Sequence, residues 1–348
     1  MLWRWLKRLV LLAVVLVIGL LAPVGYNELA CIPKAKPQDY AAILPTEHHR
    51  EEARTLMTYP EWHIVHAYDD YAQVIGAGDP HDFGYLRAIG GFWSSLCALS
   101  GATADHGGFA WETKQMVYVI GVSFTAELLA KAAYEETIGR VATWLRGPAR
   151  APLDDLSATH ARAYAQFLQQ VPWYKWDFTG DAGALAAQAT TGLRDTERRV
   201  ALGLEYRAKA AYAQVIAGAV AQVGADALTL RMIVTDVTVS QLEALDGIRV
   251  IAERPEGVEI ETPRYRELAR LLVRMAEQGA TFVEIAGNDD ILFTALSDQP
   301  TAPDAIHSFA RQGYGDTRHL ILVRVADLAD RLRGMGQGAL TLEHIHDY

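Results

Sequence analysis

The feature that most constrains this chain is an uncharged, apolar stretch near its N-terminus. No charged residue occurs between Leu9 and Asn27. Nineteen helical residues rise by about 28 Å, which is close to the ~30 Å hydrocarbon core of a bilayer. Three basic residues, Arg4, Lys7 and Arg8, precede the stretch. The pattern predicts that the chain begins with a transmembrane helix.

A cleaved secretory signal has the same general shape, as does a lipoprotein signal. Pro23 directly after Ala22 disfavours cleavage there, and Glu28 occupies the −3 position for a cut after Ala30. The same Glu28 stands where a lipoprotein signal ending before Cys31 needs an apolar residue. We therefore predict a retained signal-anchor helix, with cleavage or lipidation as the alternatives.

The basic N-terminus favours a cytoplasmic start, although Lys34 and Lys36 on the far side weaken that preference. We expect a single-pass protein of the bacterial inner membrane, with its body in the periplasm. The chain has two cysteines, Cys31 and Cys97. In an oxidising compartment such a pair predicts one disulfide bond, and two unpaired thiols are the alternative.

Residues 25–348 carry 29 basic and 42 acidic residues, a net charge of −13. This acidic body argues against nucleic acid as a partner and against adsorption to anionic lipid. The sequence divides into a signal-anchor helix over residues 1–27, an extended linker over 28–45, an α-helical domain over 46–224 and an α+β domain over 225–348. The predicted fold class is therefore α+β and multidomain.

The helical domain is predicted to be a bundle of amphipathic helices, one of which runs over residues 111–146. The uncharged stretches 88–104 and 115–126 fit buried bundle helices, and a second membrane span is the alternative for each. Glu127, Lys131 and Glu135 are spaced by four residues, which is typical of an exposed, salt-bridged stripe.

After residue 224 the sequence alternates short runs of branched residues with two helical patterns. Strand, helix and strand in this order favour a ferredoxin-like α+β sandwich. Residues 287–290 (Gly-Asn-Asp-Asp) are typical of a hairpin turn. Residues 278–284 and 337–343 share a short sequence similarity, and an internal duplication of this region is one explanation for it. The predicted strands lie at residues 228–237, 248–253, 258–261, 281–286, 291–296, 320–325 and 340–344.

The densest group of chemically versatile residues is His63, His66 and Asp70. Their spacing of i, i+3 and i+7 places two imidazoles and a carboxylate on one helical face, which is the ligand type of a zinc or iron site. The apolar stripe of the same helix lies on the opposite face. We therefore expect these residues to face solvent and to hold no metal.

Two further groups leave several interpretations open. His344 and His346 share one face of the last predicted strand, where a frayed polar terminus is expected and a metal site is the alternative. Four aromatic residues follow a predicted helix and suit packing on the bundle, a partner surface or a membrane contact. These four residues are Trp173, Tyr174, Trp176 and Phe178.

The sequence contains no His-Glu-x-x-His, Walker A, Gly-x-Ser-x-Gly or Cys-x-x-Cys motif. The hypothesis that fits best is a non-catalytic interaction or assembly module held at the membrane, without a cofactor. Its expected partners are membrane lipid and another envelope protein. One alternative is a metal-dependent enzyme or metal-binding protein that uses the face of His63, His66 and Asp70. A second alternative is small-ligand binding by the C-terminal α+β domain.

Overall fold

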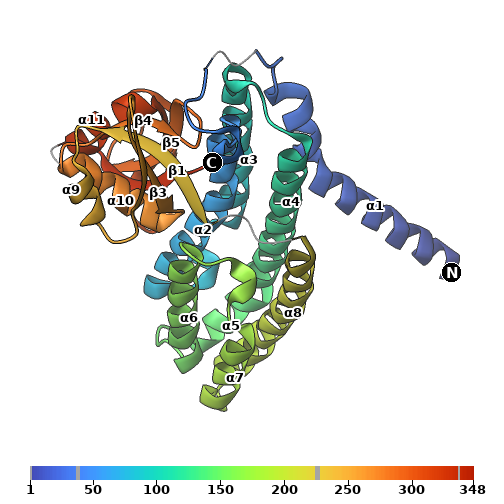
Figure 1. The fold of residues 1–348 in the computed structure, drawn as a ribbon. Helices are drawn as coiled ribbons and strands as arrows, with labels where there is room; N and C mark the ends of the chain where they lie inside the picture. Colours follow the sequence, from blue (N-terminus) through green and yellow to red (C-terminus); the bar gives the residue numbers. More distant parts are fainter. Residues whose placement is uncertain (1, 37–39, 224–227, 336–337) are drawn as a thin grey trace.

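The computed structural model describes residues 2–36, 40–223, 228–335 and 338–348. Helices make up the first two thirds of the chain, and two four-stranded sheets with three helices make up the last third (Figure 1). The mixed helix and sheet class is confirmed, while the predicted boundary at residues 224 and 225 lies outside the described residues. The longer helices are α1 (Leu2–Tyr26), α2 (Ala53–Ala77), α3 (Tyr85–Ala102), α4 (Trp111–Tyr134), α5 (Arg140–Arg146), α6 (Pro152–Leu168), α7 (Phe178–Gln188), α8 (Leu193–Val223), α10 (Arg266–Glu277) and α11 (Val325–Met335).

Short helical turns connect these elements. Two are π-helical, η1 (Asn27–Cys31) and η5 (Glu135–Gly139), and the second joins α4 to α5 so that the helix continues from Trp111 to Arg146. The other short elements are η2 (Thr46–His48), η3 (Pro80–Asp82), η4 (Thr103–His106), η6 (Trp173–Lys175) and α9 (Val239–Glu243).

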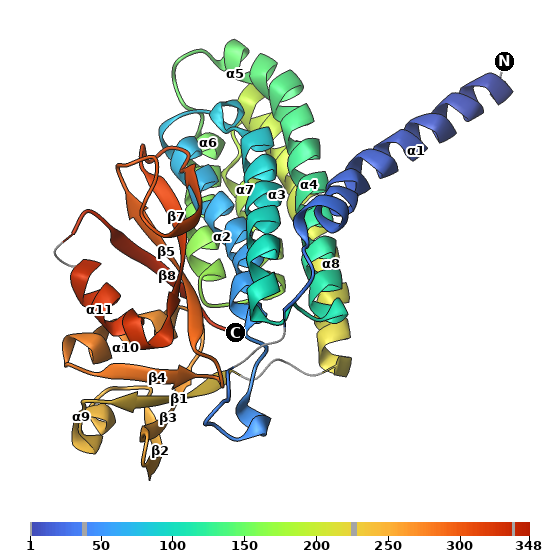
Figure 2. The same ribbon diagram turned by 90° about the horizontal axis from the view of Figure 1, so that it is seen from above.

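The predicted apolar N-terminal helix is confirmed, and it projects from the body (Figures 1 and 2). Its large apolar side chains between Trp3 and Ile18 are exposed because no other element covers them, whereas Val24 near its end packs on the helical body. The helical stretch Trp3–Cys31 is long and apolar enough to cross a membrane. The stretch Trp111–Arg146 is long and apolar enough as well, with about a third of its most apolar window buried in the protein.

The end of α1 is fixed to the helical body at several points. A disulfide bond joins Cys31 to Cys97 of α3, with Cα atoms 5.0 Å apart. The Tyr118 hydroxyl of α4 donates to Glu28 Oε1 at 2.5 Å, and Asn27 Nδ2 donates to the Tyr118 oxygen at 2.9 Å. The direction in which α1 leaves the body is therefore set by contacts with α3 and α4.

The two sheets are antiparallel, with strand orders β2-β3-β1-β4 and β6-β7-β5-β8. The segment at residues 287–290 joins β4 to β5, which lie in different sheets, so the predicted hairpin is wrong. The strand β6 was not predicted. The strands are β1 (Thr229–Thr235), β2 (Arg249–Arg254), β3 (Gly257–Pro263), β4 (Thr281–Ile285), β5 (Asp290–Ser297), β6 (Ala305–Ala310), β7 (Thr317–Arg324) and β8 (Thr341–His346).

The second sheet is covered on both faces. Ile291 and Phe293 of β5 belong to the core that the sheets share with α10 and α11, whereas Leu292 belongs to the core of the helical body. This alternation follows from the two-residue period of a strand. Helix α2 consequently packs between the other bundle helices and the second sheet, and both of its sides are covered (Figure 2).

Candidate functional site

The two histidine motifs of the sequence meet between α2 and β8. The Trp62 indole of α2 stacks on the His344 imidazole of β8, with ring centroids 3.4 Å apart. The same indole lies 5.7 Å from the ring of His66, and the rings of His344 and His346 are 5.0 Å apart. We refer to these residues and the polar groups around them as the histidine cluster. Its members are Trp62, His63, His66, Asp70, Arg311, Arg318, Glu343, His344 and His346.

The prediction that His63, His66 and Asp70 face solvent is wrong. These residues expose only 4%, 7% and 5% of their surface. An apolar stripe shows which face of a helix must be buried, but it does not show whether a second element covers the opposite face. In this fold the second sheet covers the polar face of α2, so each polar group there must be satisfied inside the protein.

The prediction of a frayed C-terminus is also wrong, because the last residues are buried. His346 is fully buried, and its backbone oxygen accepts from the Thr55 hydroxyl of α2 at 2.5 Å. Asp347 accepts two hydrogen bonds from Arg264 at 2.9 and 3.0 Å. The Tyr348 hydroxyl donates to the backbone oxygen of Asp290. The end of the chain is thus part of the core.

A bidentate ion pair lies at the centre of the histidine cluster. The register between β5 and β8 shifts beside Glu343, and such a bulge redirects a side chain. Arg318 of β7 donates from Nε and Nη2 to the two carboxylate oxygens of Glu343, at 2.5 and 2.6 Å. His66 Nδ1 lies 3.6 Å from Glu343 Oε1. The charge of Glu343 is therefore matched inside the protein.

The two carboxyl groups of the cluster have opposite pKa shifts. Burial acts to raise the pKa of Glu343, but the neighbouring Arg318 and Arg311 lower it by more than burial raises it. The net shift of this pKa is therefore downward. Burial raises the pKa of Asp70 to about 6, although Arg318 and the backbone N–H of Gln312 act against the shift. That N–H donates to Asp70 Oδ2 at 2.9 Å. Asp70 is thus the cluster's carboxyl group that takes up a proton near neutral pH.

The four imidazoles are neutral because they are buried. Burial lowers the pKa of His63 and of His344 to about 3, and it lowers the pKa of His66 and of His346 well below the usual range. His63 Nε2 lies 3.0 Å from the backbone oxygen of Ala88, to which it donates. Among the described residues, Nε2 of His66 and both ring nitrogens of His346 have no hydrogen-bond partner.

Neutral imidazoles and carboxylates are ligands for zinc and iron. However, His63 and Asp70 are directed to different partners, Ala88 and Gln312. In the described part of the chain, three donor atoms converge within 4.8 Å at two other places. These are the groups Glu52, His106, Asp290 and Asp79, His81, Asp82.

The first of these groups is held together by charge pairing. His106 Nδ1 lies 3.5 Å from Glu52 Oε2 and 3.7 Å from Asp290 Oδ2. The hydrogen bond to Glu52 raises the pKa of His106 despite its burial. Asp289 precedes Asp290 in the chain, and burial and the nearby Glu52 raise the pKa of Asp289 to about 6. A protonated His106 therefore offsets part of the negative charge of this group.

Glu127 and Lys131 of α4 and Glu135 of η5 form a charged network with α8. The prediction of an exposed stripe is wrong, because Lys131 Nζ lies 3.1 Å from Glu205 Oε1, and the buried Glu135 accepts from Arg198 at 2.8 and 3.0 Å. Glu127 pairs with Lys209 Nζ at 2.7 Å. A cavity of about 30 Å³ beside this network is too small for a metabolite.

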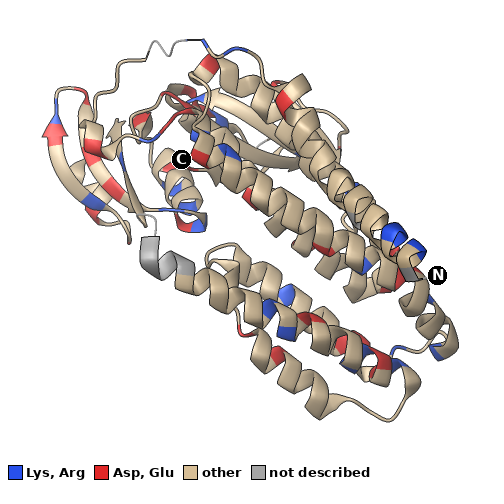
Figure 3. Cartoon of the chain, turned by 90° about the vertical axis from the view of Figure 1, so that its right-hand side faces the viewer, with Lys and Arg blue, Asp and Glu red and all other residues tan. Residues whose placement is uncertain are grey.

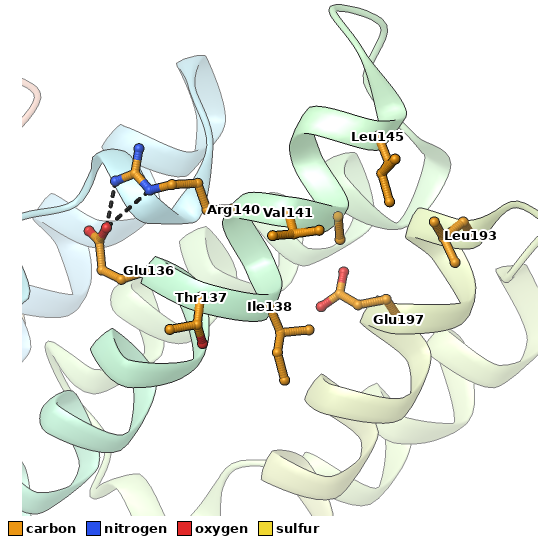
Figure 4. Close-up of a pocket in the computed structure, with 9 residues that line it drawn as sticks. Glu136, Thr137, Ile138, Arg140, Val141, Leu145, Leu193 and Glu197 are labelled. Carbon is orange, nitrogen blue, oxygen red and sulfur yellow. Dashed lines mark hydrogen bonds and ion pairs between the residues drawn. The ribbon is translucent and has the colours of Figure 1, made fainter.

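A larger surface hollow of about 640 Å³ lies between α5 and the start of α8 (Figure 4). The side chains that surround it are mainly apolar, and they include Ile138, Val141, Leu145 and Leu193. The charged pair at its edge is self-contained, because Arg140 Nη2 lies 2.5 Å from Glu136 Oε2. The hollow offers an apolar surface with few groups for acid, base or nucleophilic chemistry.

The four aromatic residues after α6 pack mostly on the bundle. Phe178 is buried, whereas Trp173, Tyr174 and Trp176 are half-buried. Trp176 lies 5.0 Å from Phe167, measured between ring centroids, and its indole N–H donates to Asp181 at 2.8 Å. Trp173 and Tyr174 therefore remain partly exposed on the outer surface of this segment.

Arg311 and Arg318 are site residues that the sequence did not indicate. Each lies in a segment without a motif, and each reaches the cluster because β6 and β7 pair beside β5. A local pattern cannot identify such residues. When the chain is compared with known protein families, with curated proteins and with solved structures, it matches none of them.

Proposed function

We propose that this chain is a membrane-anchored, non-catalytic interaction module of the bacterial envelope. The observation that supports this most is where its exposed apolar side chains lie. Outside α1 and η1, sixteen large apolar side chains are exposed among the described residues, and thirteen of them lie on α4, η5, α5 and α8. These are Trp111, Met116, Val119, Leu129, Ile138, Val141, Trp144, Leu145, Leu193, Val200, Leu204, Tyr212 and Val215.

Exposed apolar patches of this kind mark contact surfaces for membranes or proteins. The histidine cluster is the densest group of titratable residues, and it is buried between α2 and the second sheet. Catalytic sites instead combine a cleft with convergent polar groups. The geometry therefore favours function by contact over chemistry.

We further propose that α1 is a retained, single span of the inner membrane, with a cytoplasmic N-terminus and a periplasmic body. The basic residues before the apolar stretch support this orientation. The disulfide between Cys31 and Cys97 supports it as well, because such bonds persist in oxidising compartments.

Thiol labelling in cells tests the orientation. The native cysteines are bonded to each other, so a cysteine introduced in place of the exposed Glu256 is the reactive thiol of that variant. A membrane-impermeant maleimide should label Glu256→Cys in spheroplasts, whereas Trp5→Cys should react only after lysis. Labelling of Glu256→Cys only after lysis would contradict the proposal. Mass spectrometry of the N-terminus checks that α1 is retained.

A protein partner is proposed at the outer sides of Trp173 and Tyr174. A photoreactive residue at the adjacent, exposed Lys175 should form a discrete cross-link to another envelope protein in living cells. The same probe at Glu256 is the control. The cross-link should disappear when Tyr174 is changed to alanine, and a cross-link that persists in that variant would speak against this surface.

The strand order of the two sheets supports a more specific proposal about the fold. With the strands of each sheet numbered in chain order, both sheets read 4-1-3-2 from one edge to the other. This is the arrangement that a β-α-β-β-α-β unit produces when all neighbouring strands are antiparallel. We propose that each sheet belongs to a ferredoxin-like unit, the second of which has no described helix between its first two strands.

Metal binding is the second candidate function. It is favoured by the buried ring nitrogens of His66 and His346 that have no hydrogen-bond partner among the described residues. Metal analysis of the purified full chain is the test. Stoichiometric zinc or iron that is lost in both His66→Ala and His346→Ala, but kept in Asp79→Ala, would establish this function. A metal-free wild-type protein would rule it out.

A further inference from the structure

We propose that the outward sides of α4, α5 and α8 lie in the periplasmic side of the same lipid bilayer that α1 crosses. This inference rests on the proposed membrane anchoring of α1, and it identifies what covers the apolar surface of the bundle. The occupant is the lipid itself, rather than a second protein.

The first observation behind this proposal is the direction of the charged side chains on α4. Between Gln115 and Tyr134, a stretch that is fully described, every charged side chain is turned into the bundle. Glu127 and Lys131 are these residues, and they pair with α8 and its neighbours. Twenty helical residues rise by about 30 Å, so this side of α4 offers lipid an uncharged surface of that length.

The exposed side of the same stretch is uncharged. Met116, Val119 and Leu129 are exposed there, together with small residues such as Ala130 and Ala133. Charged residues that face the interior, with apolar residues facing outward, are typical of helices in contact with lipid. A helix on the surface of a soluble bundle has the reverse arrangement.

Helices α5 and α8 extend this surface. Val141 and Leu145 of α5 lie beside Leu193 of α8 around the apolar hollow (Figure 4). Further along α8, Val200 and Val215 are exposed. The exposed charged residues of η5, α5 and α8 are Glu136, Arg140, Arg199 and Arg207. Glu136 and Arg140 pair with each other, and the side chains of Arg199 and Arg207 are long enough to reach lipid headgroups.

The attachment of α1 brings this surface to a membrane. Helix α1 leaves the body on the side of α4, while the two sheets lie on the other side of α2 and α3 (Figures 1 and 2). Figure 3 views the molecule from the side of α1 and shows long stretches of helix without Lys, Arg, Asp or Glu. Because Cys31 and Glu28 are held by α3 and α4, a bilayer around α1 approaches α4 and its neighbours.

Two tryptophans mark the ends of the continuous helix. Trp111 opens it and Trp144 lies near its end, and Trp144 exposes 78% of its surface. Tryptophan is enriched at membrane–water interfaces, where its ring is partly in hydrocarbon and its N–H remains hydrated. This placement fits a helix that lies at the surface of a bilayer.

Spin-label accessibility in vesicles tests the proposal. Single cysteines replace Val141, Val200, Leu16 or Glu256 in the full chain, which is reconstituted at low protein density into vesicles of phosphatidylcholine and phosphatidylglycerol. Oxygen concentrates in lipid, whereas a nickel chelate stays in water. Labels at Val141 and Val200 should resemble the label at Leu16, with oxygen accessibility several-fold above that of the Glu256 label and little access to nickel.

Each other outcome contradicts the proposal in a recognisable way. If the Leu16 label is in lipid but the labels at Val141 and Val200 are open to nickel, the anchor holds and the lipid contact is wrong. If these two labels are shielded from both reagents, a second copy of the chain covers the surface instead. If the Leu16 label itself is open to nickel, the anchoring proposal fails, and the lipid contact fails with it.

Discussion

The indole ring of Trp62 lies against the imidazole ring of His344, with centroids 3.4 Å apart and planes inclined by 28°. The contact joins α2 to the last strand of the chain, across the interface between the helical body and the second sheet. Both side chains are buried, and His66 and His346 flank the pair. The pair is therefore one of the contacts that hold these two parts of the protein together.

Removing the indole should destabilise the protein strongly. Trp62→Ala leaves a cavity in a closely packed region and should lower the free energy of unfolding by about 3–5 kcal/mol. Urea denaturation of the full chain in detergent measures the effect. Trp144→Ala is the matched control, because that ring is exposed and its removal should change the stability by no more than about 0.5 kcal/mol. Equal effects of the two substitutions would contradict the role given to Trp62.

The ion pair between Arg318 and Glu343 gives a second prediction. Arg318→Ala leaves the carboxylate of Glu343 buried without its bidentate partner, and it should cost about 3–5 kcal/mol. The double variant Arg318→Met, Glu343→Leu removes both charges and should regain most of that loss. The same denaturation measurement applies. If the double variant is as unstable as Arg318→Ala, the loss comes from packing rather than from the unpaired charge.

The histidine cluster should make the protein sensitive to acid. His63 and His344 have a folded-state pKa of about 3, below their ordinary value of 6.5. The unfolded chain therefore binds more protons below pH 6.5, and stability falls as the pH falls, by about 1.4 kcal/mol per pH unit for each histidine. Asp70 acts in the opposite direction, because its raised pKa of about 6 means that its contribution is lost as the pH rises.

The four buried histidines of the cluster, all with a lowered pKa, should outweigh the raised pKa values of Asp70 and Asp289, so the net result is a loss of stability in acid. Denaturation midpoints at about pH 7.5 and about pH 5.5 measure this loss. His344→Phe keeps a ring against Trp62 but does not titrate, so its stability should depend less on pH. An unchanged pH dependence in this variant would show that other groups cause the acid sensitivity.

The disulfide bond gives the last prediction. Cys31 and Cys97 are 66 residues apart in the sequence, and closing a loop of that length stabilises by roughly 4 kcal/mol in the chain-entropy relation. Cys31→Ser, Cys97→Ser and the double variant should lose the same stability, because each removes the same bond. A double variant that is clearly less stable than either single variant would indicate that the cysteines also contribute separately. Denaturation without reductant is the measurement.

The sequence by itself determined the features that depend on nearby residues. The apolar run of α1, the helix from residue 111 to 146 and seven of the eight strands each follow from local hydrophobicity and period. The two cysteines pointed to a single bond, because a lone pair in an oxidising compartment has one pairing. The sequence also identified most of the residues that form the histidine cluster, as two separate motifs.

Only the tertiary structure decided what those residues face. His63, His66 and Asp70 lie opposite an apolar stripe, and this pattern normally indicates solvent. They are buried because the second sheet, formed from residues more than 200 positions later, packs on that side of α2. On α4, by contrast, Glu127 and Lys131 are turned into the bundle, whereas Met116, Val119 and Leu129 are exposed. The side of a helix that is buried depends on its neighbours in space, and local periodicity does not contain that information.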